Sequence, residues 1–597
     1  MTARTVSIGC ASGFWGDSAY AAAQLVGRGR IDYLVSDYLA EITLSLLARA
    51  RAKSPDAGYP PDFVAAHAPL LPEIRRRGIR VVSNAGGMNP RACRDALAKA
   101  AADAGVGLRI AIVEGDDLMS RVEELRALAP AEMSSGAPLP ARLASCNAYL
   151  GARPIAAALA MGADVVLTGR CVDSALVLGI LMHEFGWRGD DFDRLAAGSL
   201  AGHVIECGPQ CTGGIFTDWR DVPGWDDMGY PIVECGADGG FVVAKPEGTG
   251  GLVSVGTVSE QIVYEIGDPA AYALPDVVCD WRGVRLEQAG PDRVRVSGAR
   301  GRPPTPRYKV CATYADGWRV IATMMLAGRE SAERARRMGQ AIVSRTQRLN
   351  GEAGRPAYRE ASVEVIGAED TYGANASAAL RAGAREVVLK IGLRHDDKAA
   401  LELFGQEMMQ AGVAMAQGTT GAFGGRPAPS PVVRLFSFLL DKRAVPVHVD
   451  FEGRQTPVVE AAGVEPAPAK PEPAPPAPPS AAGGIEVPLV RLAWGRSGDK
   501  GNDANIGIVA RQARYVPVLR AELTAERVAA YFSHYLQGPV ARWELPGLHA
   551  FNFVLKDVLG GGGIASLRYD PQGKTYAQML LDLPIRVPAE LVGEGSP

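Results

Sequence analysis

The sequence predicts an α/β protein with an N-terminal doubly wound, mostly parallel sheet, a second α/β domain and a small C-terminal α+β domain. Three observations support this prediction. Short apolar runs alternate with helical patterns through residues 1–195, mixed patterns fill residues 196–460, and a proline-rich segment at residues 461–484 sets residues 485–597 apart. A hydrophobic content of 47% over 597 residues is sufficient for several apolar cores.

Strand and helix patterns alternate in the first 195 residues. Five short apolar segments have the composition of strands: Thr5–Cys10, Tyr33–Val35, Arg80–Ser83, Arg109–Val113 and Asp164–Thr168. Helical composition fills the intervals, as in Asp17–Val26, Asp62–Arg77 and Asn89–Ala104. Asn89-Pro90 is a strong helix start, because asparagine caps the first turn and proline is tolerated at the first helical position. Alternation at this spacing predicts βαβ units and a parallel sheet.

Residues 196–460 predict a second α/β domain, or an extension of the first. Cys207–Gly214 and Gly236–Gly256 are glycine-rich and β-type in composition. A helix is expected at Ser331–Arg348 and another at Ala399–Gln410, with strands at Glu360–Ile366 and Val387–Ile391.

The segment at residues 461–484 is the clearest boundary in the chain. Its proline-rich core, Glu465 to Ala482, favours an extended conformation of about 3.1 Å per residue and could span roughly 50 Å as a semi-rigid linker. The domain after it predicts the order strand, loop, strand, helix, strand, glycine turn, strand, helix. The corresponding segments are Val487–Trp494, Gly495–Asn505, Ile506–Val509, Thr524–Tyr535 with Thr524 as N-cap, Ala550–Leu555, Gly560–Gly563, Ser566–Tyr569 and Thr575–Leu581.

Composition argues against several classes of partner and compartment. Lysine and arginine number 63 and aspartate and glutamate 66, a balance that does not suit a nucleic-acid-binding protein. Nine scattered cysteines predict free thiols rather than a disulfide framework. Because we find neither a secretory signal nor a run of 18 apolar residues, we expect a cytoplasmic protein without a membrane partner. A homo-oligomer is a separate expectation.

Polar residues follow every predicted strand of residues 1–195. Ligands of doubly wound sheets bind at the carboxyl ends of the strands, so a shared polar site is expected there. The candidate substrate-binding residues are Ser12, Gly13, Asp17, Asn84, Gly86, Gly87 and Asn147, and the candidate catalytic residues are Asp37, Glu114, Arg170 and Asp173. The alternative is that Asp17, Asn89, Asp117 and Asp173 only cap helices.

Two roles are assigned within this set. Glu114 and Asp37 are the candidates for acid and base, if burial separates their pKa values. The planar guanidinium of Arg170 suits a substrate carboxylate or phosphate, although a structural salt bridge is an equally good interpretation.

The segment Gly495–Asn505 predicts a binding loop in the C-terminal domain. It contains three glycines and four charged side chains between two apolar runs, a composition suited to wrapping backbone N–H groups around an anion. Arg496, Asp499, Lys500 and Asn502 are therefore further candidate substrate-binding residues. Alternatively, Asp499 and Lys500 form an exposed pair in a hairpin loop.

Standard cofactor and nucleophile motifs are missing from the sequence. Gly9, Gly13 and Gly16 do not have the G-x-G-x-x-G spacing, and neither a P-loop nor a G-x-S-x-G motif occurs. One dense group of potential ligands, His203, Glu206, Cys207 and Cys211, suits a metal site or a reactive thiol, but a strand and turn with incidental thiols fits as well. We predict no metal site, and no cofactor is identified.

Several segments together resemble the acyclic terpene utilisation family, AtuA. They are Gly9–Asp17, Asp37–Glu41, Asn84–Pro90, Asn147–Gly151, Leu167–Leu176, His203–Gly208 and Cys211–Gly214. Gly495–Asn505 and Leu559–Gly563 resemble the ferredoxin-like C-terminal module of this family. The resemblance covers nearly the whole chain except the proline-rich linker, and it carries no established catalytic residue.

The resemblance implies a role in the breakdown of terpenoids through branched acyl-CoA thioesters. We therefore expect an enzyme of acyclic terpenoid or branched-chain acyl-CoA or carboxylic-acid catabolism, with lyase- or hydratase-type acid–base chemistry on a small-molecule substrate such as a CoA thioester. The alternatives are a non-catalytic assembly or binding subunit of an acyl-CoA carboxylase system, and a nucleotide- or metal-dependent ligase.

Overall fold

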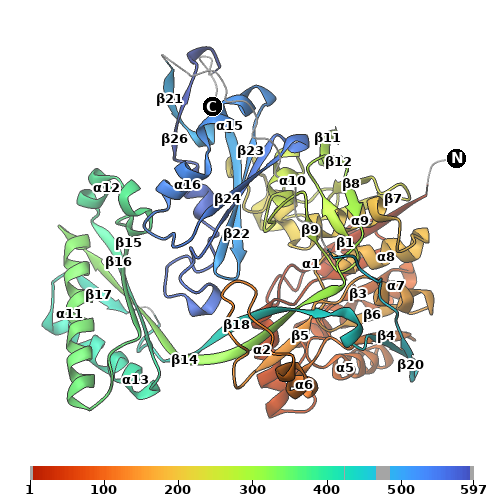
Figure 1. Ribbon diagram of the computed structural model, residues 1–597, viewed down its shortest axis with the longest axis horizontal. Helices are drawn as coiled ribbons and strands as arrows, with labels where there is room; N and C mark the ends of the chain where they lie inside the picture. The colour runs from red at the N-terminus through yellow and green to blue at the C-terminus, as the bar shows by residue number, and fades with distance from the viewer. Residues whose placement is uncertain (1–3, 423, 466–483, 592–597) are drawn as a thin grey trace.

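One sheet of 11 strands organises most of the N-terminal half of the chain (Figure 1). The computed structural model describes residues 4–422, 424–465 and 484–591. Five adjacent strands at the centre of this sheet are parallel, in the order β1-β2-β3-β6-β4. Their bounds are Thr5–Cys10, Tyr33–Ser36, Arg80–Ser83, Val165–Thr168 and Ile110–Glu114. They are the five strands that the sequence predicts, and they confirm the α/β class.

Antiparallel strands from later in the chain extend this sheet on both sides. Beyond β1 lie β7 (Ile232–Gly236), β8 (Phe241–Ala244), β12 (Arg293–Ser297) and β11 (Arg285–Gly290). Beyond β4 lie β19 (His448–Phe451) and β20 (Arg454–Pro457). A short three-stranded sheet combines β9 (Tyr272–Ala273), β10 (Val278–Asp280) and β13 (Arg300–Arg302).

Helices cover both faces of the parallel strands, because successive side chains of a strand point to opposite faces. Val81 and Val165 pack into one apolar cluster, whereas their neighbours Val82 and Val166 pack into another. The first face is covered by α1 (Ala21–Arg28), α3 (Pro61–His67), α4 (Leu71–Arg77) and α5 (Pro90–Asp103). The second is covered by α7 (Arg153–Ala160), α8 (Ala175–Phe185) and α9 (Phe192–Ile205).

A second sheet forms the lobe on the left of Figure 1 and has its own apolar core. Its longest strand, β14 (Arg307–Ala327), pairs at one end with β5 (Ser145–Ala148) and at the other with β16 (Glu386–His395). Its other strands are β15 (Glu360–Ile366), β17 (Thr419–Ala422) and β18 (Ser430–Asp441). The nearby helices are α11 (Ser331–Glu352), α12 (Ala378–Gly383), α13 (Lys398–Glu407) and α14 (Ala411–Ala414).

The C-terminal domain is a four-stranded antiparallel sheet with helices, consistent with the predicted ferredoxin-like α+β class. The sheet order is β22 (Ala493–Lys500), β23 (Asp503–Ala510), β25 (Ala550–Leu555) and β24 (Val540–Leu545). The helices are α15 (Val516–Glu522), α16 (Ala525–Tyr531) and α17 (Tyr576–Leu580), and β21 (Ile485–Pro488) pairs with β26 (Pro584–Val587). The predicted N-cap is confirmed, because the Thr524 hydroxyl accepts the Arg527 N–H.

The segment Gly495–Asn505, predicted as a loop, is nearly all strand. β22 and β23 form a hairpin that turns at Gly501, whose φ of +68° favours glycine. Two other glycines of the hairpin allow close packing. A Cβ at Gly498 would lie 2.5 Å from the Tyr264 ring, and one at Gly507, just beyond the predicted segment, would lie 2.2 Å from the Val263 side chain. Tertiary contact therefore accounts for Gly498 and Gly507.

Three further sequence predictions differ from the structure. Cys207–Gly214 contains a 3₁₀ turn over Gly208–Thr212 instead of a strand, and Ser566–Tyr569 is not a strand. β24 is absent from the prediction, although Arg542 to Leu545 alternates polar and apolar residues as a strand does. Most of the predicted linker 461–484 lies outside the described residues.

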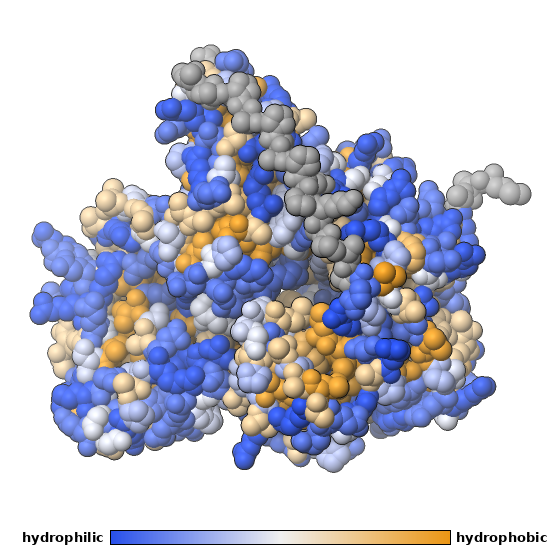
Figure 2. Space-filling model, in the orientation of Figure 1, coloured by the Kyte–Doolittle hydropathy of each residue, from blue (hydrophilic) through white to orange (hydrophobic). Residues whose placement is uncertain are grey.

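Three further helices are α2 (Glu41–Lys53), α6 (Val122–Ala127) and α10 (Val255–Ile262). The last of these packs between the N-terminal sheet and the C-terminal domain. Hydrophilic residues predominate on the face shown in Figure 2, and hydrophobic ones gather in its lower centre, where Figure 1 places α2 and α6. None of the helices in the described residues combines the length and the apolar character that a membrane crossing requires.

Candidate functional site

The carboxyl ends of the five parallel strands carry the predicted polar residues along one edge of the sheet. Strand order decides which of them meet. β3 and β6 lie between β2, which ends before Asp37, and β4, which ends at Glu114. Three strand spacings separate the two backbones by roughly 14 Å. The structure therefore does not bring Asp37 and Glu114 together as an acid–base pair.

Asp37 and Asn84 form the buried centre of the edge. Asn84 donates its side-chain amide to Asp37 Oδ1 at 2.6 Å and accepts the Tyr38 N–H at 2.7 Å. The Leu39 N–H also donates to Asp37 Oδ1, at 3.2 Å. Both side chains are buried, with Asp37 4% exposed. Neighbouring strands thus hold this carboxyl in one orientation.

Arg170 and Asp173 lie beside Asp37. One guanidinium nitrogen of Arg170, Nη1, donates to Asp173 Oδ1 at 2.7 Å and to the Leu39 carbonyl at 2.8 Å. The peptide of Leu39 therefore contacts both Asp37 and Arg170. Arg170 is buried, whereas the Asp173 side chain is 37% exposed. The salt-bridge interpretation of Arg170 is confirmed, and we call Asp37, Asn84, Arg170 and Asp173 the central cluster.

The two carboxyl groups of the central cluster have contrasting surroundings. Burial raises the pKa of Asp37 well above its usual value, and the charge of Asp173 raises it further, while Arg170 and the hydrogen bond from Asn84 act in the opposite direction. Asp173 instead forms an ion pair with Arg170 at the boundary with solvent. A buried carboxyl group with a raised pKa and an ion-paired carboxyl group at the boundary with solvent are thus placed beside one arginine.

Tyr149 adds an aromatic surface with two cations beside it. The Arg170 guanidinium carbon lies 4.3 Å from the centre of the Tyr149 ring, and Lys309 Nζ lies 4.8 Å from it. Tyr149 was not among the predicted site residues, although it stands two positions after Asn147 in the same segment.

Asp116 supports the loop that carries Arg170 and was also missed. Its Oδ2 accepts the Arg170 N–H at 2.8 Å and the Asn147 amide at 2.9 Å. A Cβ at Gly169 would lie 2.3 Å from Asp116 Oδ1, which explains the glycine there. Burial raises the pKa of Asp116 to about 7, against the effect of these two hydrogen bonds.

The loop that follows β1 has a structural role in the site. The Ser12 hydroxyl donates to the carbonyl oxygens of Phe14 and Asp37, at 3.0 and 2.9 Å. Asp17 accepts the Gly13 N–H at 2.9 Å and the Tyr230 hydroxyl at 2.7 Å. Because α1 begins at Ala21, Asp17 closes its own loop and does not cap the helix.

The remaining residues of this edge also have identifiable contacts. The backbone at Gly86 is packed so closely that a Cβ would lie 2.5 Å from the Thr168 carbonyl, and Gly87 has a φ of +58°. Asn89 caps α5 as predicted, with its side chain accepting the Ala92 N–H. Asp117 caps a 3₁₀ turn instead, accepting the Met119 N–H at 3.0 Å.

The end of α9 and the residues after it lie next to the central cluster and form a wall. His203 Nδ1 lies 3.2 Å from Glu206 Oε1, so the two pair with each other. Burial raises the pKa of the Cys207 thiol, and the charge of Glu206 raises it further, which disfavours a nucleophilic thiolate. The described part of the chain contains no group of three or more histidine, cysteine, aspartate and glutamate side chains arranged to hold a metal ion.

The C-terminal domain brings lysines to this wall. Lys574 Nζ donates to Glu265 Oε1 at 2.8 Å and to Asp499 Oδ1 at 3.1 Å. Burial favours a raised pKa for Glu265, but the charges of Lys574 and Lys500 outweigh it and lower the pKa. Lys500 itself is exposed, with Nζ 6.0 Å from the centre of the Tyr272 ring. The sequence offered no signal for Lys574, which lies far along the chain.

Of the other predicted residues of this segment, Arg496 contacts the preceding domain and Asn502 makes contacts within the C-terminal domain. Arg496 is buried, stacks on Tyr264 and donates to the Gln210 side chain. Asn502 donates to Asp557 at 3.0 Å and accepts the Gly561 N–H at 2.5 Å, which fixes the hairpin turn to the glycine-rich segment.

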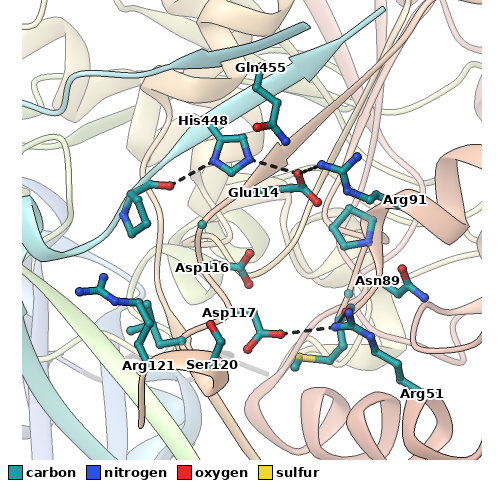
Figure 3. Close-up of a pocket in the computed structure, with 16 residues that line it drawn as sticks. Arg51, Asn89, Arg91, Glu114, Asp116, Asp117, Ser120, Arg121, His448 and Gln455 are labelled. Atoms are coloured by element: carbon teal, nitrogen blue, oxygen red, sulfur yellow. Dashed lines mark hydrogen bonds and ion pairs between the residues drawn. The ribbon is translucent and has the colours of Figure 1, made fainter. Parts of the chain in front are cut away.

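Glu114 lines a separate cavity of about 420 Å³ at the end of β4, which we call the outer pocket (Figure 3). Glu114 Oε2 accepts from Arg91 at 2.5 Å and lies 3.2 Å from His448 Nε2. Arg51 and Asp117 face each other across the pocket at 3.5 Å. Its lining therefore contains ionisable residues of both signs.

The geometry of the central cluster suits proton transfer. Asp37, a buried carboxyl group with a raised pKa, and Asp173, an ion-paired one, lie beside Arg170, and Lys309 and Lys500 lie beside the rings of Tyr149 and Tyr272. Such a set can protonate one atom of a substrate, deprotonate another and attract an anionic group.

Comparison with known protein families gives two matches along the chain. The model of the acyclic terpene utilisation family protein AtuA matches residues 6–451, and that of the AtuA ferredoxin-like domain matches residues 487–586. No curated protein and no solved structure matches the chain significantly.

Proposed function

Because the chain belongs to the acyclic terpene utilisation family AtuA, we propose that it is an enzyme of acyclic terpenoid or branched-chain acyl-CoA catabolism. The reaction that we propose is the addition of water to a conjugated double bond, or its reverse. The observation that carries this proposal is the contrast between Asp37 and Asp173 around Arg170.

Asp173 and Asp37 have separate roles in the proposed hydration. Asp173 takes a proton from a water molecule, and the water oxygen forms a bond to the β-carbon of the substrate. Asp37 gives its proton to the α-carbon as the carbon–carbon double bond becomes single. The proton on Asp173 returns to Asp37 through solvent, which restores the starting state. The same steps in reverse constitute a lyase reaction.

Cationic side chains support an anionic substrate. Lys309 and Lys500 are exposed and approach Tyr149 and Tyr272 from different domains. A CoA thioester has phosphate groups that such lysines attract through long-range electrostatics. In this proposal the C-terminal domain contributes Lys500 to substrate binding.

Turnover of branched α,β-unsaturated acyl-CoA thioesters tests the proposal. Mass spectrometry should detect a product heavier by one water molecule, or the reverse reaction from the 3-hydroxy compound. Asp37→Asn and Asp173→Asn should each lower kcat by roughly 10²- to 10⁴-fold, the usual contribution of a general acid or base. Asp190→Asn is the matched control, because that carboxylate pairs with Arg188 at the surface.

Two results would contradict the proposal. Full activity of the Asp37 and Asp173 variants would remove both residues from the mechanism. Absence of turnover with every thioester, together with co-purification of acyl-CoA carboxylase subunits, would favour a non-catalytic subunit instead.

A further inference from the structure

The outer pocket lies apart from the central cluster and has a different set of residues. It is built from the end of β4, the start of α5 and the strands β19 and β20. Its volume of about 420 Å³ falls in the range of small-molecule sites. β3 and β6 separate β4 from the strand that leads to Asp37. A ligand here would therefore occupy a second site.

Arg51 offers unused hydrogen-bond donors to this pocket. Its Nη1 donates to the Met88 carbonyl at 2.5 Å and faces Asp117 at 3.5 Å, which is long for a charge-assisted bond. Among the described residues, Nε and Nη2 of Arg51 have no hydrogen-bond partner. The side chain is 48% exposed. This planar pair of donors matches the two oxygens of a carboxylate.

Arg91 compensates the negative charge of Glu114, whose Oε2 accepts from it at 2.5 Å. His448 Nε2 lies 3.2 Å from the same oxygen, and its Nδ1 lies 3.2 Å from the Pro446 carbonyl. Glu114 is thus already paired within the lining of the pocket, which leaves Nε and Nη2 of Arg51 as the donors for an anion.

Asp116 contributes a buried carboxyl oxygen at the edge of the pocket. Asp116 is only 3% exposed, and both of its hydrogen bonds involve Oδ2. Within the described residues Oδ1 has no hydrogen-bond partner, and Figure 3 shows Asp116 among the side chains that line the pocket. A pKa raised to about 7 by burial gives this carboxyl a proton to donate at neutral pH.

We propose that the outer pocket binds a small organic carboxylate, with Arg51 pairing its two oxygens and Asp116 donating a hydrogen bond to one of them. A single guanidinium whose Nε and Nη2 lack hydrogen-bond partners among the described residues suits a monoanion. Glu114 and Asp117 disfavour a dianion such as phosphate, because each adds negative charge to the lining.

Calorimetric titration of the full chain with 3-methylbutanoate tests this site. The wild type should bind, Arg51→Gln should weaken binding at least tenfold, and Arg51→Lys should give an intermediate loss because it retains the charge without the planar fork. Asp116→Asn should retain binding, since its side-chain amide can replace the donor. Arg188→Gln, at an exposed ion pair elsewhere, is the control and should bind as the wild type does.

The same titrations also give the results that would overturn the proposal. Asp173→Asn should bind 3-methylbutanoate normally, and loss of binding in that variant would place the carboxylate in the central cluster. Unchanged binding by Arg51→Gln, no binding by the wild type, or tighter binding of inorganic phosphate would each contradict the assignment. Circular dichroism of each variant establishes that it is folded.

Discussion

The carboxyl groups of Asp37 and Asp116 have environments that differ from that of Asp173. Asp37 and Asp116 are buried and accept hydrogen bonds mainly from amides, so burial dominates and raises their pKa values. Asp173 stands at the boundary with solvent beside a guanidinium. Hydrogen bonds from neutral amides orient a carboxyl group without supplying the positive charge that would keep it ionised.

The raised pKa of Asp116 predicts a pH-dependent cost to stability. The pKa of this carboxyl is about 4 in the unfolded state and about 7 in the native state. Between these two pH values the native state holds a proton that the unfolded state has lost. The free energy of unfolding therefore falls as pH rises through this window. Asp116→Asn retains the acceptor for both donors and removes the titration. The variant should therefore gain stability over the wild type from pH 5 to pH 8, by an amount on the order of 3 kcal/mol.

Urea denaturation of both proteins at the two pH values measures this effect. Asp103→Asn is the matched control, because that carboxylate is exposed on α5 and pairs only with Lys99. Equal stability differences at pH 5 and pH 8 would show that Asp116 is ionised in the native state.

At the scale of elements, the β22–β23 hairpin connects the C-terminal domain to α10. Its glycines face the residues that follow this helix, and Asn505 accepts the Glu265 N–H at 2.7 Å. The hairpin therefore determines where Lys500 stands relative to Tyr272.

Gly507→Ala should displace this hairpin from α10. A Cβ would lie 2.2 Å from the Val263 side chain and 2.9 Å from its carbonyl oxygen, so the domains must separate locally. A cost of about 1–3 kcal/mol is typical of such overpacking. We expect a lower Tm and faster proteolytic cleavage between the domains. Gly351→Ala, where nothing lies within 4 Å, should leave both measurements unchanged, and equal behaviour of the two variants would refute this interpretation.

Local sequence patterns predict correctly those strands whose apolar run has clear ends. The bounds of β1 and β3 agree with the prediction because each apolar run is bounded by polar or glycine residues. Gly495–Asn505 is predicted as a loop because its glycines and charges are typical of loops. In the structure Gly498 instead packs against the residues that follow α10. Asn84, Arg170 and Asp173 meet Asp37 because of the general rule for strand ends. Glu114 does not meet Asp37, because local sequence does not determine the order of the strands in the sheet.

At the scale of the whole molecule, the C-terminal domain contacts both lobes of the protein. Arg511 pairs with Asp218 through two guanidinium nitrogens at 2.5 and 2.6 Å, and the Trp494 indole donates to the same carboxylate at 2.7 Å. On the other side, His534 Nε2 lies 2.9 Å from the Thr371 carbonyl, and Asn375 donates to the Tyr531 carbonyl at 2.8 Å. We expect these noncovalent contacts to hold the C-terminal domain in place without the covalent linker.

Cleavage of the chain within residues 466–483 should therefore leave the two pieces associated. Size-exclusion chromatography after cutting at an inserted protease site should give one complex. Arg511→Gln should weaken this complex about tenfold or more, because a bidentate, half-buried pair contributes more than a surface pair. Arg443→Gln, whose pair with Asp441 is exposed, is the control. Immediate separation of the unsubstituted pieces would contradict the prediction.

β14 passes from β5, beside Asn147, into the sheet of the second lobe. Its register with β18 shifts between Ala315 and Trp318, and Gly317 there has a φ of +75°. Because a β-bulge bends a strand and increases its twist, this position sets the direction in which β14 leaves β5. The orientation of the second lobe relative to Asn147, which donates its amide to Asp116, therefore depends on the backbone at Gly317.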